Sequence, residues 1–366
     1  MKTINKKSLA AVDLFCGAGG LTKGLELARI DVRLGVDIDP ACKFPFEANT
    51  DAKFLLKRIE KVTPVEIRRA FGHDKIKILA GCAPCQPFSL YRLGKSDHTD
   101  SRWRLLANFQ RLVLAVKPHV VTMENVPRLA EHRVFKRFTA ALERAGFQVW
   151  HAVVRCADYG VPQVRERLVL LASRLGPISL IPPTHTQERH KTVRQAIATL
   201  PRLKANGVDP RDRLHQCSAL SETNLKRIKA SRPGGTWRDW SRTLVAKCHR
   251  KPSGRSYPSV YGRMSWDEPA PTLTGQFFGF GNGRFGHPEQ NRAISLREGA
   301  ILQSFPRNYR FIERGAPIYR KRIGLLIGNA VPVKLAEAIG RTIRLHVQAA
   351  RRARKRKPTP KKPNTG

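Results

Sequence analysis

Short apolar runs alternate with stretches of helical spacing over the first 173 residues, and this alternation limits the possible folds more than any other feature of the chain. Leu21, Leu25 and Ala28 recur at the spacing of one helix face, and Gly146 follows a later helical stretch as its C-cap. Strands that alternate with helices predict an α/β fold with a doubly wound, mostly parallel sheet, which binds ligands beyond the carboxyl ends of its strands. The predicted strands are the runs LAAVDLF, VRLGVDID, KIKILAG, HVVTMENV, FQVWHAVV and ERLVLLAS.

The alternation of predicted strands and helices stops near Ser173. The following residues are rich in Pro, Gly and Arg, which predicts a second, smaller and irregular domain with Trp237 or Trp240 as a core anchor. A helical pattern then returns and ends in a packed C-terminal helix with a polar interruption. We therefore predict a main domain of residues 1–173 and 291–348, a second domain of residues 174–290, and a basic disordered tail of residues 349–366.

The charge balance favours a polyanionic partner. Lys and Arg total 68 against 28 Asp and Glu, a formal net charge of +40 at pH 7. Nucleic acid is the first partner that such an excess suggests, although a solvated basic surface would give the same count. No run of about 18 or more apolar residues occurs, so we expect no membrane span.

The seven cysteines are odd in number and follow no disulfide framework, which predicts reduced thiols in a cytoplasm. Cys82 and Cys85 form a C-x-x-C, but no second pair stands at metal-binding spacing, so we expect no bound metal. A thioredoxin-like redox site is an alternative for this pair.

A glycine-rich turn, DLFCGAGG, follows the first predicted strand and opens a helix. Glycines let the backbone approach a ligand, and free N–H groups at a helix start favour a negative charge. Gly17 and Gly19 fit the dinucleotide fingerprint, but Thr22 stands at its third position. Asp37 ends the second strand, where an acid can bind the ribose hydroxyls of an adenosine cofactor. The pattern does not separate a nicotinamide from S-adenosylmethionine, and a tight turn without a ligand is the alternative.

Polar residues follow the other predicted strands. Cys85 lies between two prolines in PCQP, a rigid frame that suits a nucleophile. Glu124 ends a strand in ENV, and Gln163, Arg165 and Arg167 alternate in QVRER, so they would share one face of a strand. A rigid turn, a strand-end cap and a solvated edge are the structural alternatives. The placement of these groups at successive strand ends favours a polar binding site.

These segments resemble the ordered motifs of the cytosine-C5 DNA methyltransferase family over residues 9–173 and 263–345. The resemblance implies the S-adenosylmethionine-dependent methyltransferase fold, with residues 174–290 as the target recognition domain. The matching segments are DLFCGAGG, PCQPFS, DSRWRLLANFQRLV, ENV, QVRER, RAISLREGAILQSFP and GNAVP.

The resemblance also implies a reaction. The Cys85 thiolate would add to C6 of a cytosine flipped out of duplex DNA, and C5 would then accept a methyl group from S-adenosylmethionine. Glu124 would contact N3 and the exocyclic amine, Arg167 would hold O2, and Arg165 would support the catalytic loop. Residues 90–99 would form a loop that closes over the base.

The cofactor residues implied by the resemblance come from every part of the main domain. The family has an acid near the adenine amine, but Arg58 stands at that position in this chain. The implied set is Phe15, Gly17, Gly19, Asp37, Ile59, Pro84, Leu105, Asn329 and Val331.

Two other functions remain open: a C5 methyltransferase that acts on RNA, and a DNA-binding protein without catalysis. We expect double-stranded DNA as partner, a monomer in the cytoplasm at the nucleoid, and a restriction endonuclease as a functional companion.

Overall fold

The computed structural model describes residues 9–73, 76–83 and 103–356. Pro84, Cys85 and the predicted loop of residues 90–99 therefore lie outside the described residues.

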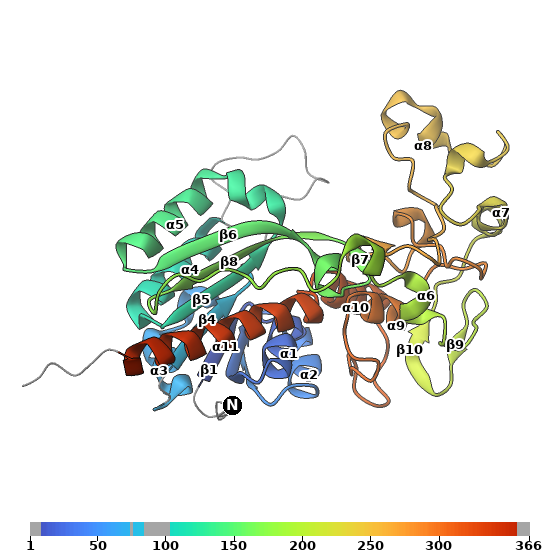
Figure 1. The fold of residues 1–366 in the computed structure, drawn as a ribbon. Helices are drawn as coiled ribbons and strands as arrows, with labels where there is room; N and C mark the ends of the chain where they lie inside the picture. The colour runs from blue at the N-terminus through green and yellow to red at the C-terminus, as the bar shows by residue number, and fades with distance from the viewer. Residues whose placement is uncertain (1–8, 74–75, 84–102, 357–366) are drawn as a thin grey trace, which may run out of the picture.

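Within this described part, a seven-stranded sheet with the order β3-β2-β1-β4-β5-β8-β6 forms the centre of the main body (Figure 1). The strands from β3 to β5 run parallel, whereas β8 runs antiparallel to both β5 and β6. This confirms the predicted doubly wound, mostly parallel sheet and adds β3, an edge strand too short to show a pattern. The strands are β1 (Leu9–Leu14), β2 (Asp31–Asp37), β3 (Lys53–Leu56), β4 (Ile76–Gly81), β5 (Val120–Asn125), β6 (Gln148–Arg155) and β8 (Glu166–Ser173).

Helices cover both faces of the sheet, because alternate side chains of each strand point to opposite sides. Leu9 and Ala11 of β1 belong to the core that includes α1 and α11, while Ala10 and Val12 belong to the core of α3, α4 and α5. The N-terminal part of α11, after the polar interruption predicted in the sequence, packs along α1. The helices are α1 (Gly20–Leu27), α2 (Lys43–Glu47), α3 (Pro64–Phe71), α4 (Trp103–Val116), α5 (Arg133–Arg144) and α11 (Val333–Arg356).

One helical stretch of the described chain, Arg320–Ala353, has the length and apolarity of a candidate membrane span. However, 78% of its most apolar window is buried inside the protein, as in the core helix of a globular domain.

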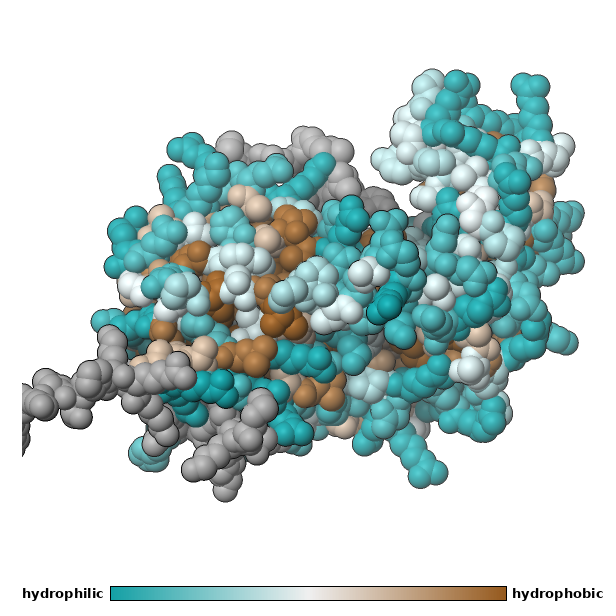
Figure 2. Space-filling model, viewed as in Figure 1, coloured by the Kyte–Doolittle hydropathy of each residue, from teal (hydrophilic) through white to brown (hydrophobic). Residues whose placement is uncertain are grey.

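The chain after the sheet builds two smaller cores. One joins α6, β10, α9 and α10, and the other forms a lobe that projects away from the sheet (Figure 1). Trp237 and Trp240 are both buried in the lobe core, which confirms the prediction of a tryptophan anchor. Figure 2 shows a hollow between this lobe and the main body. The strands and α-helices outside the seven-stranded sheet and its covering helices are β7 (Gln163–Val164), α6 (Val193–Ile197), β9 (Val208–Asp209), β10 (Asp212–Gln216), α7 (Glu222–Ala230), α8 (Lys247–Arg250), β11 (Ala270–Pro271), α9 (Leu296–Leu302) and α10 (Arg320–Gly328).

Two predictions need correction. Helix α11 continues to Arg356, so residues 349–356 of the predicted disordered tail are helical. Ala, Arg and Lys favour helices, and a helix that is already formed extends at little cost. In QVRER, the chain leaves the strand at Arg165, whose carbonyl accepts the N–H of Cys156 at 2.7 Å. The three polar side chains of this segment therefore do not stand on one continuous strand.

Candidate active site

The strand ends singled out in the sequence meet at one edge of the sheet. Strands β4 and β5 are parallel, with Gly81 opposite Met123, so both end at this edge, and the antiparallel β8 begins there. Glu124 lies directly opposite Val169, and Arg167 precedes Val169 by two residues on the same face. Diagonal neighbours of this kind are within reach of long side chains, so the sheet register itself brings Glu124 and Arg167 together.

Glu124 and Arg167 form a buried ion pair. Glu124 Oε1 lies 2.8 Å from Arg167 Nε, and the two side chains are only 8% and 12% exposed. Burial raises the pKa of Glu124 above its ordinary value, while the positive charges of Arg167 and Arg165 oppose that rise. A carboxyl group held this way can hydrogen-bond a neutral ring in either protonation state, and the arginine beside it can hold an oxygen.

Asn125 fixes the chain just before the predicted nucleophile. Its side-chain amide donates to the carbonyl of Ala83 at 3.0 Å, and its Oδ1 accepts the N–H of Val126 at 2.9 Å. The N–H of Cys82 donates to the carbonyl of Leu14 at 3.2 Å, which ties the same segment to β1. Sequence reasoning named ENV but missed this role of Asn125, because the side chain acts on a residue 42 positions away.

The glycine loop adopts a left-handed backbone at three positions, Phe15 (φ +61°), Gly17 (φ +53°) and Gly19 (φ +89°). A Cβ placed on Gly17 would meet nothing within 4 Å, so the backbone there is open to a ligand. Asp37 accepts the N–H of Gly17 and the N–H of Asp39, each at 2.9 Å. The acid and the loop that the sequence paired are thus in direct contact.

The profile of the family described as C-5 cytosine-specific DNA methylase matches residues 9–345. The chain belongs to this family. It is 49% identical over 338 residues to the Type II methylase M.HgiDII of Herpetosiphon aurantiacus, with 92% of this chain and 95% of that protein covered. It is 33% identical over 342 residues to the Type II methyltransferase M1.HphI of Haemophilus parahaemolyticus, with 92% and 87% covered.

A solved structure of the Entamoeba histolytica methyltransferase EhMeth has a TM-score of 0.65 and 17% identity, and the match covers 91% of this chain and 97% of that one. At this identity the likeness concerns the fold, which is that of the S-adenosylmethionine-dependent methyltransferases. The chain is therefore a DNA (cytosine-5-)-methyltransferase in fold and family.

The remaining cofactor residues predicted for this methyltransferase come from several elements. Val331 is buried, and its carbonyl would lie 2.4 Å from a Cβ on Gly20, so a glycine is needed where α1 meets GNAVP. Asn329 is exposed at the C-cap of α10. Ile59 is buried at the start of the 3-10 helix Ile59–Lys61, Leu105 of α4 is half-buried, and Pro84 lies outside the described residues.

Arg58 precedes that 3-10 helix and is 58% exposed, with Glu60 at 3.5 Å as an ion-pair partner. A surface pair of this length contributes little to stability, so Arg58 is not fixed by the fold.

Arg165 of the methyltransferase joins three segments. Its guanidinium is buried and donates to the carbonyls of Leu273 (2.9 Å) and Gly328 (3.0 Å). Two glutamines add to these contacts. Gln163 donates to the side-chain oxygen of Gln303 at 2.7 Å, and Gln303 donates to the carbonyl of Ala330 at 2.7 Å. Arg165 therefore positions residues 272–275 (TLTG) and residues 328–332 (GNAVP), and Gln303 is a positioning residue that the sequence reasoning missed.

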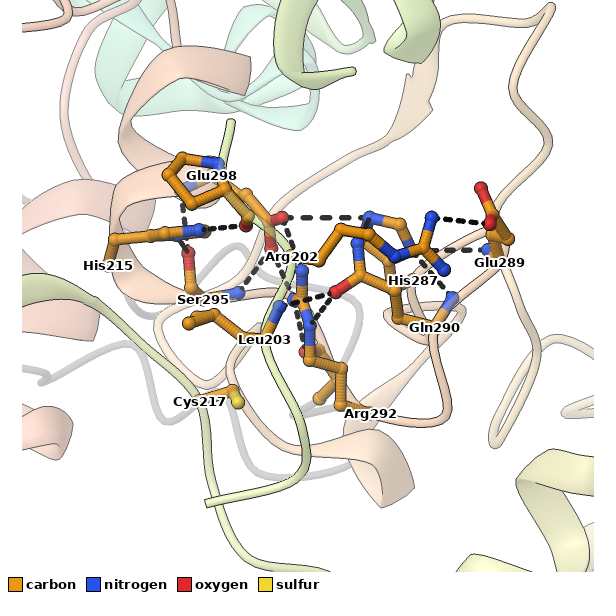
Figure 3. Close-up of polar contacts among 12 residues, drawn as sticks. Arg202, Leu203, His215, Cys217, His287, Glu289, Gln290, Arg292, Ser295 and Glu298 are labelled. Carbon is orange, nitrogen blue, oxygen red and sulfur yellow. Dashed lines mark hydrogen bonds and ion pairs between the residues drawn. The ribbon is translucent and has the colours of Figure 1, made fainter. Parts of the chain in front are cut away.

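A buried ionic network joins residues of β10, the segment around His287 and α9 (Figure 3). Arg292 donates to both carboxylate oxygens of Glu298 at 2.7 and 2.8 Å, with both side chains at most 1% exposed. The N–H of Ser295 donates to Glu298 at 2.6 Å, and Ser295 Oγ lies 2.8 Å from His215 Nδ1. His287 Nε2 lies 3.7 Å from Glu298 Oε1. The network thus joins α9 to the segments that carry His215 and His287.

Glu298 and His287 of the network both have a pKa below the ordinary value, for different reasons. Burial alone would raise the pKa of Glu298, but the hydrogen bonds and charge of Arg292 outweigh it and lower that pKa to about 2. Burial lowers the pKa of His287 to about 4 despite the attraction of Glu298. At neutral pH the carboxylate is charged and the imidazole is neutral, so Arg292 is the cation that Glu298 pairs with.

Over the described ranges 9–73, 76–83 and 103–356, no group of three or more His, Cys, Asp or Glu side chains is arranged to hold a metal ion.

Proposed function

We propose that this protein transfers a methyl group from S-adenosylmethionine to C5 of a flipped-out cytosine in a specific duplex DNA sequence, through a covalent bond between Cys85 and C6. The observation that carries the proposal is the buried ion pair of Glu124 and Arg167. It stands beside Asn125, which holds the carbonyl of Ala83 two residues before Cys85.

The chemistry follows from the electron distribution of cytosine. Carbon 5 is a poor nucleophile in the intact ring. When the Cys85 thiolate adds to C6, the electron pair of the C5–C6 double bond becomes available at C5, which takes the methyl group. Loss of the C5 proton then restores the double bond and releases the sulfur. Glu124 contacts N3 and the exocyclic amine, and Arg167 holds O2, so the pair stabilises the charge that develops on the ring.

The described residues fit an adenosine-bearing methyl donor. The backbone at Gly17 borders open space, and Asp37 stands next to it as an acceptor for ribose hydroxyls. Ile38 is 55% exposed at the same strand end, which suits the apolar face of a purine. S-adenosylmethionine supplies an electrophilic methyl group on a sulfonium sulfur. The chain binds and orients this donor through Phe15, Gly17, Gly19, Asp37, Ile59, Pro84, Leu105, Asn329 and Val331.

Duplex DNA is the partner that the net charge of +40 suits. We assign base recognition to residues 174–290, which include the projecting lobe, and the hollow beside the lobe is where the duplex would lie (Figure 2). The protein acts as a monomer in the cytoplasm, with a restriction endonuclease as a functional companion.

The test is methylation of a duplex library with labelled S-adenosylmethionine, read by mass spectrometry for 5-methylcytosine. A duplex with 5-fluorocytosine at the target should trap the protein, because fluorine cannot leave C5 as a proton does. Cys85→Ala should form no trapped species and no product while it still binds DNA. Methylation by Cys85→Ala, or no trapping on a proven substrate, would refute the mechanism.

A further inference from the structure

A buried tyrosine after α9 reaches the glycine loop. Tyr309 is 1% exposed, and its hydroxyl donates to the carbonyl of Ala18 at 2.6 Å. A Cβ placed on Gly19 would lie 2.9 Å from the same hydroxyl oxygen, so the tyrosine lies against the loop itself. Phe305 and Phe311 flank its ring at 4.6 and 5.1 Å between centroids. The ring is therefore held in one place by packing.

The peptide that Tyr309 contacts is fixed at both ends. The carbonyl oxygen of Ala18 accepts the tyrosine hydroxyl, and the N–H of Gly19 in the same peptide unit donates to the carbonyl of Cys16 at 2.9 Å. Because a peptide unit is planar, holding its oxygen also fixes the direction of its N–H. These two bonds close the turn that contains Gly17, the residue whose backbone is open to a ligand.

The backbone of Tyr309 and of the next residue, Arg310, is held in turn by side chains from two other segments. Arg297 donates to the carbonyl of Tyr309 at 2.8 Å and pairs with both carboxylate oxygens of Asp212 in β10, at 2.5 and 3.0 Å. Asn49 accepts the N–H of Arg310 and donates to its carbonyl, each at 2.8 Å. The glycine loop is thus connected, through one tyrosine, to the hairpin of β9 and β10.

We propose that Tyr309 is a positioning residue for the methyl donor: it holds the glycine loop in its binding conformation, and Arg297 ties that conformation to β10. The inference rests on the proposed function, in which this loop binds S-adenosylmethionine. The loop keeps three residues at positive φ, one of them Phe15, and a left-handed backbone at a phenylalanine persists only where its surroundings enforce it. Without the hydroxyl, the loop can relax away from that shape.

The experiment compares two tyrosine-to-phenylalanine variants by calorimetry with S-adenosylmethionine. Tyr309→Phe keeps the ring and removes one hydrogen bond. Tyr159→Phe is the matched control, because Tyr159 is also buried and its hydroxyl donates to the carbonyl of Ile181 at 3.2 Å, away from the loop. Tyr309→Phe should bind S-adenosylmethionine about three- to tenfold more weakly, the effect of one buried hydrogen bond, and Tyr159→Phe should bind it as the wild type does.

Kinetics give the second readout. With Tyr309→Phe, KM for S-adenosylmethionine should rise by a similar factor, while kcat at saturating donor stays within about twofold. Asp212→Asn should shift KM in the same direction by a smaller factor. Wild-type affinity in Tyr309→Phe, or an equal loss in both tyrosine variants, would overturn the inference. If the wild type itself binds no S-adenosylmethionine, the proposed function fails, which is a distinct result.

Discussion

Replacing Glu298 by glutamine should lower the free energy of unfolding by about 3–5 kcal/mol, the cost of breaking a buried ion pair on one side. Arg292 is fully buried and donates to both oxygens of Glu298, and the N–H of Ser295 donates to the same carboxylate. A glutamine keeps the shape and one acceptor oxygen, but it turns an amide N–H toward the guanidinium. Two charge-assisted hydrogen bonds, worth about 1.5–3 kcal/mol each, are lost or weakened, which agrees with the first figure.

The assay is urea unfolding at pH 7.5, followed by tryptophan fluorescence. Glu337→Gln in α11 is the matched control, because Glu337 also has two basic partners, Lys334 and Arg341. Those partners are 51% and 54% exposed, so this substitution should cost less than about 1 kcal/mol. Equal losses in the two variants would refute the reasoning that burial, rather than the number of ion pairs, sets the magnitude.

Four further predictions concern His287, Glu124, Arg58 and the C-terminal residues after Gln348. The pKa of His287 is about 4 in the folded protein, below its ordinary value of 6.5. The free energy of unfolding should therefore fall by about 3 kcal/mol as the pH drops from 6.5 to 4. In His287→Asn, the free energy of unfolding measured by denaturant titration should depend less on pH over that window. Glu124→Gln should lower kcat by about 10²–10³ in single-turnover methylation while DNA affinity is kept, and a loss below tenfold would remove Glu124 from the chemistry. Arg58→Asp should bind S-adenosylmethionine at least as tightly as the wild type, and a tenfold loss by calorimetry would mean that Arg58 makes a favourable contact. Deletion after Gln348 removes eight Lys or Arg. If half of them contact phosphates, the slope of log K for DNA binding against log salt concentration should flatten by about three to four, with base preference unchanged. Equal slopes for the full-length and truncated proteins would exclude the tail from DNA binding.

The sequence alone predicted the class of the sheet, six of its strands and the positions of the motifs. Short apolar runs and helical spacing are local properties, so β1, β2, β4, β5, β6 and β8 could all be identified from a few neighbouring residues each. The motifs at the ends of β1 and β5 could also be identified locally, because glycine favours a left-handed turn and polar residues at the carboxyl ends of strands indicate a binding site. The roles of Cys85 and Pro84 remain predictions, since both lie outside the described residues.

Where local patterns were weak, sequence reasoning failed for identifiable reasons. Residues 349–356 have a composition typical of disorder, but they continue a helix that the buried part of α11 has already formed. QVRER alternates like a strand, but the hydrogen bonds of Arg165 to the carbonyls of Leu273 and Gly328 pull this residue out of the ladder. In the first case the preceding turns of the same helix outweigh the local preference, and in the second case contacts with residues distant in sequence do so.

Only the tertiary structure decided which side chains meet. The ion pair of Glu124 and Arg167 depends on the antiparallel register of β5 and β8, and the bond of Tyr309 to Ala18 spans 291 residues. No periodicity records such contacts, because they form when packed layers bring chain segments together. The sequence thus determined the elements and the chemistry that their ends carry. The packing of α9 against α6, α10 and β10, and of α11 against α1, determined how those ends are held. Positions fixed by many buried contacts at once cannot be derived from any one segment.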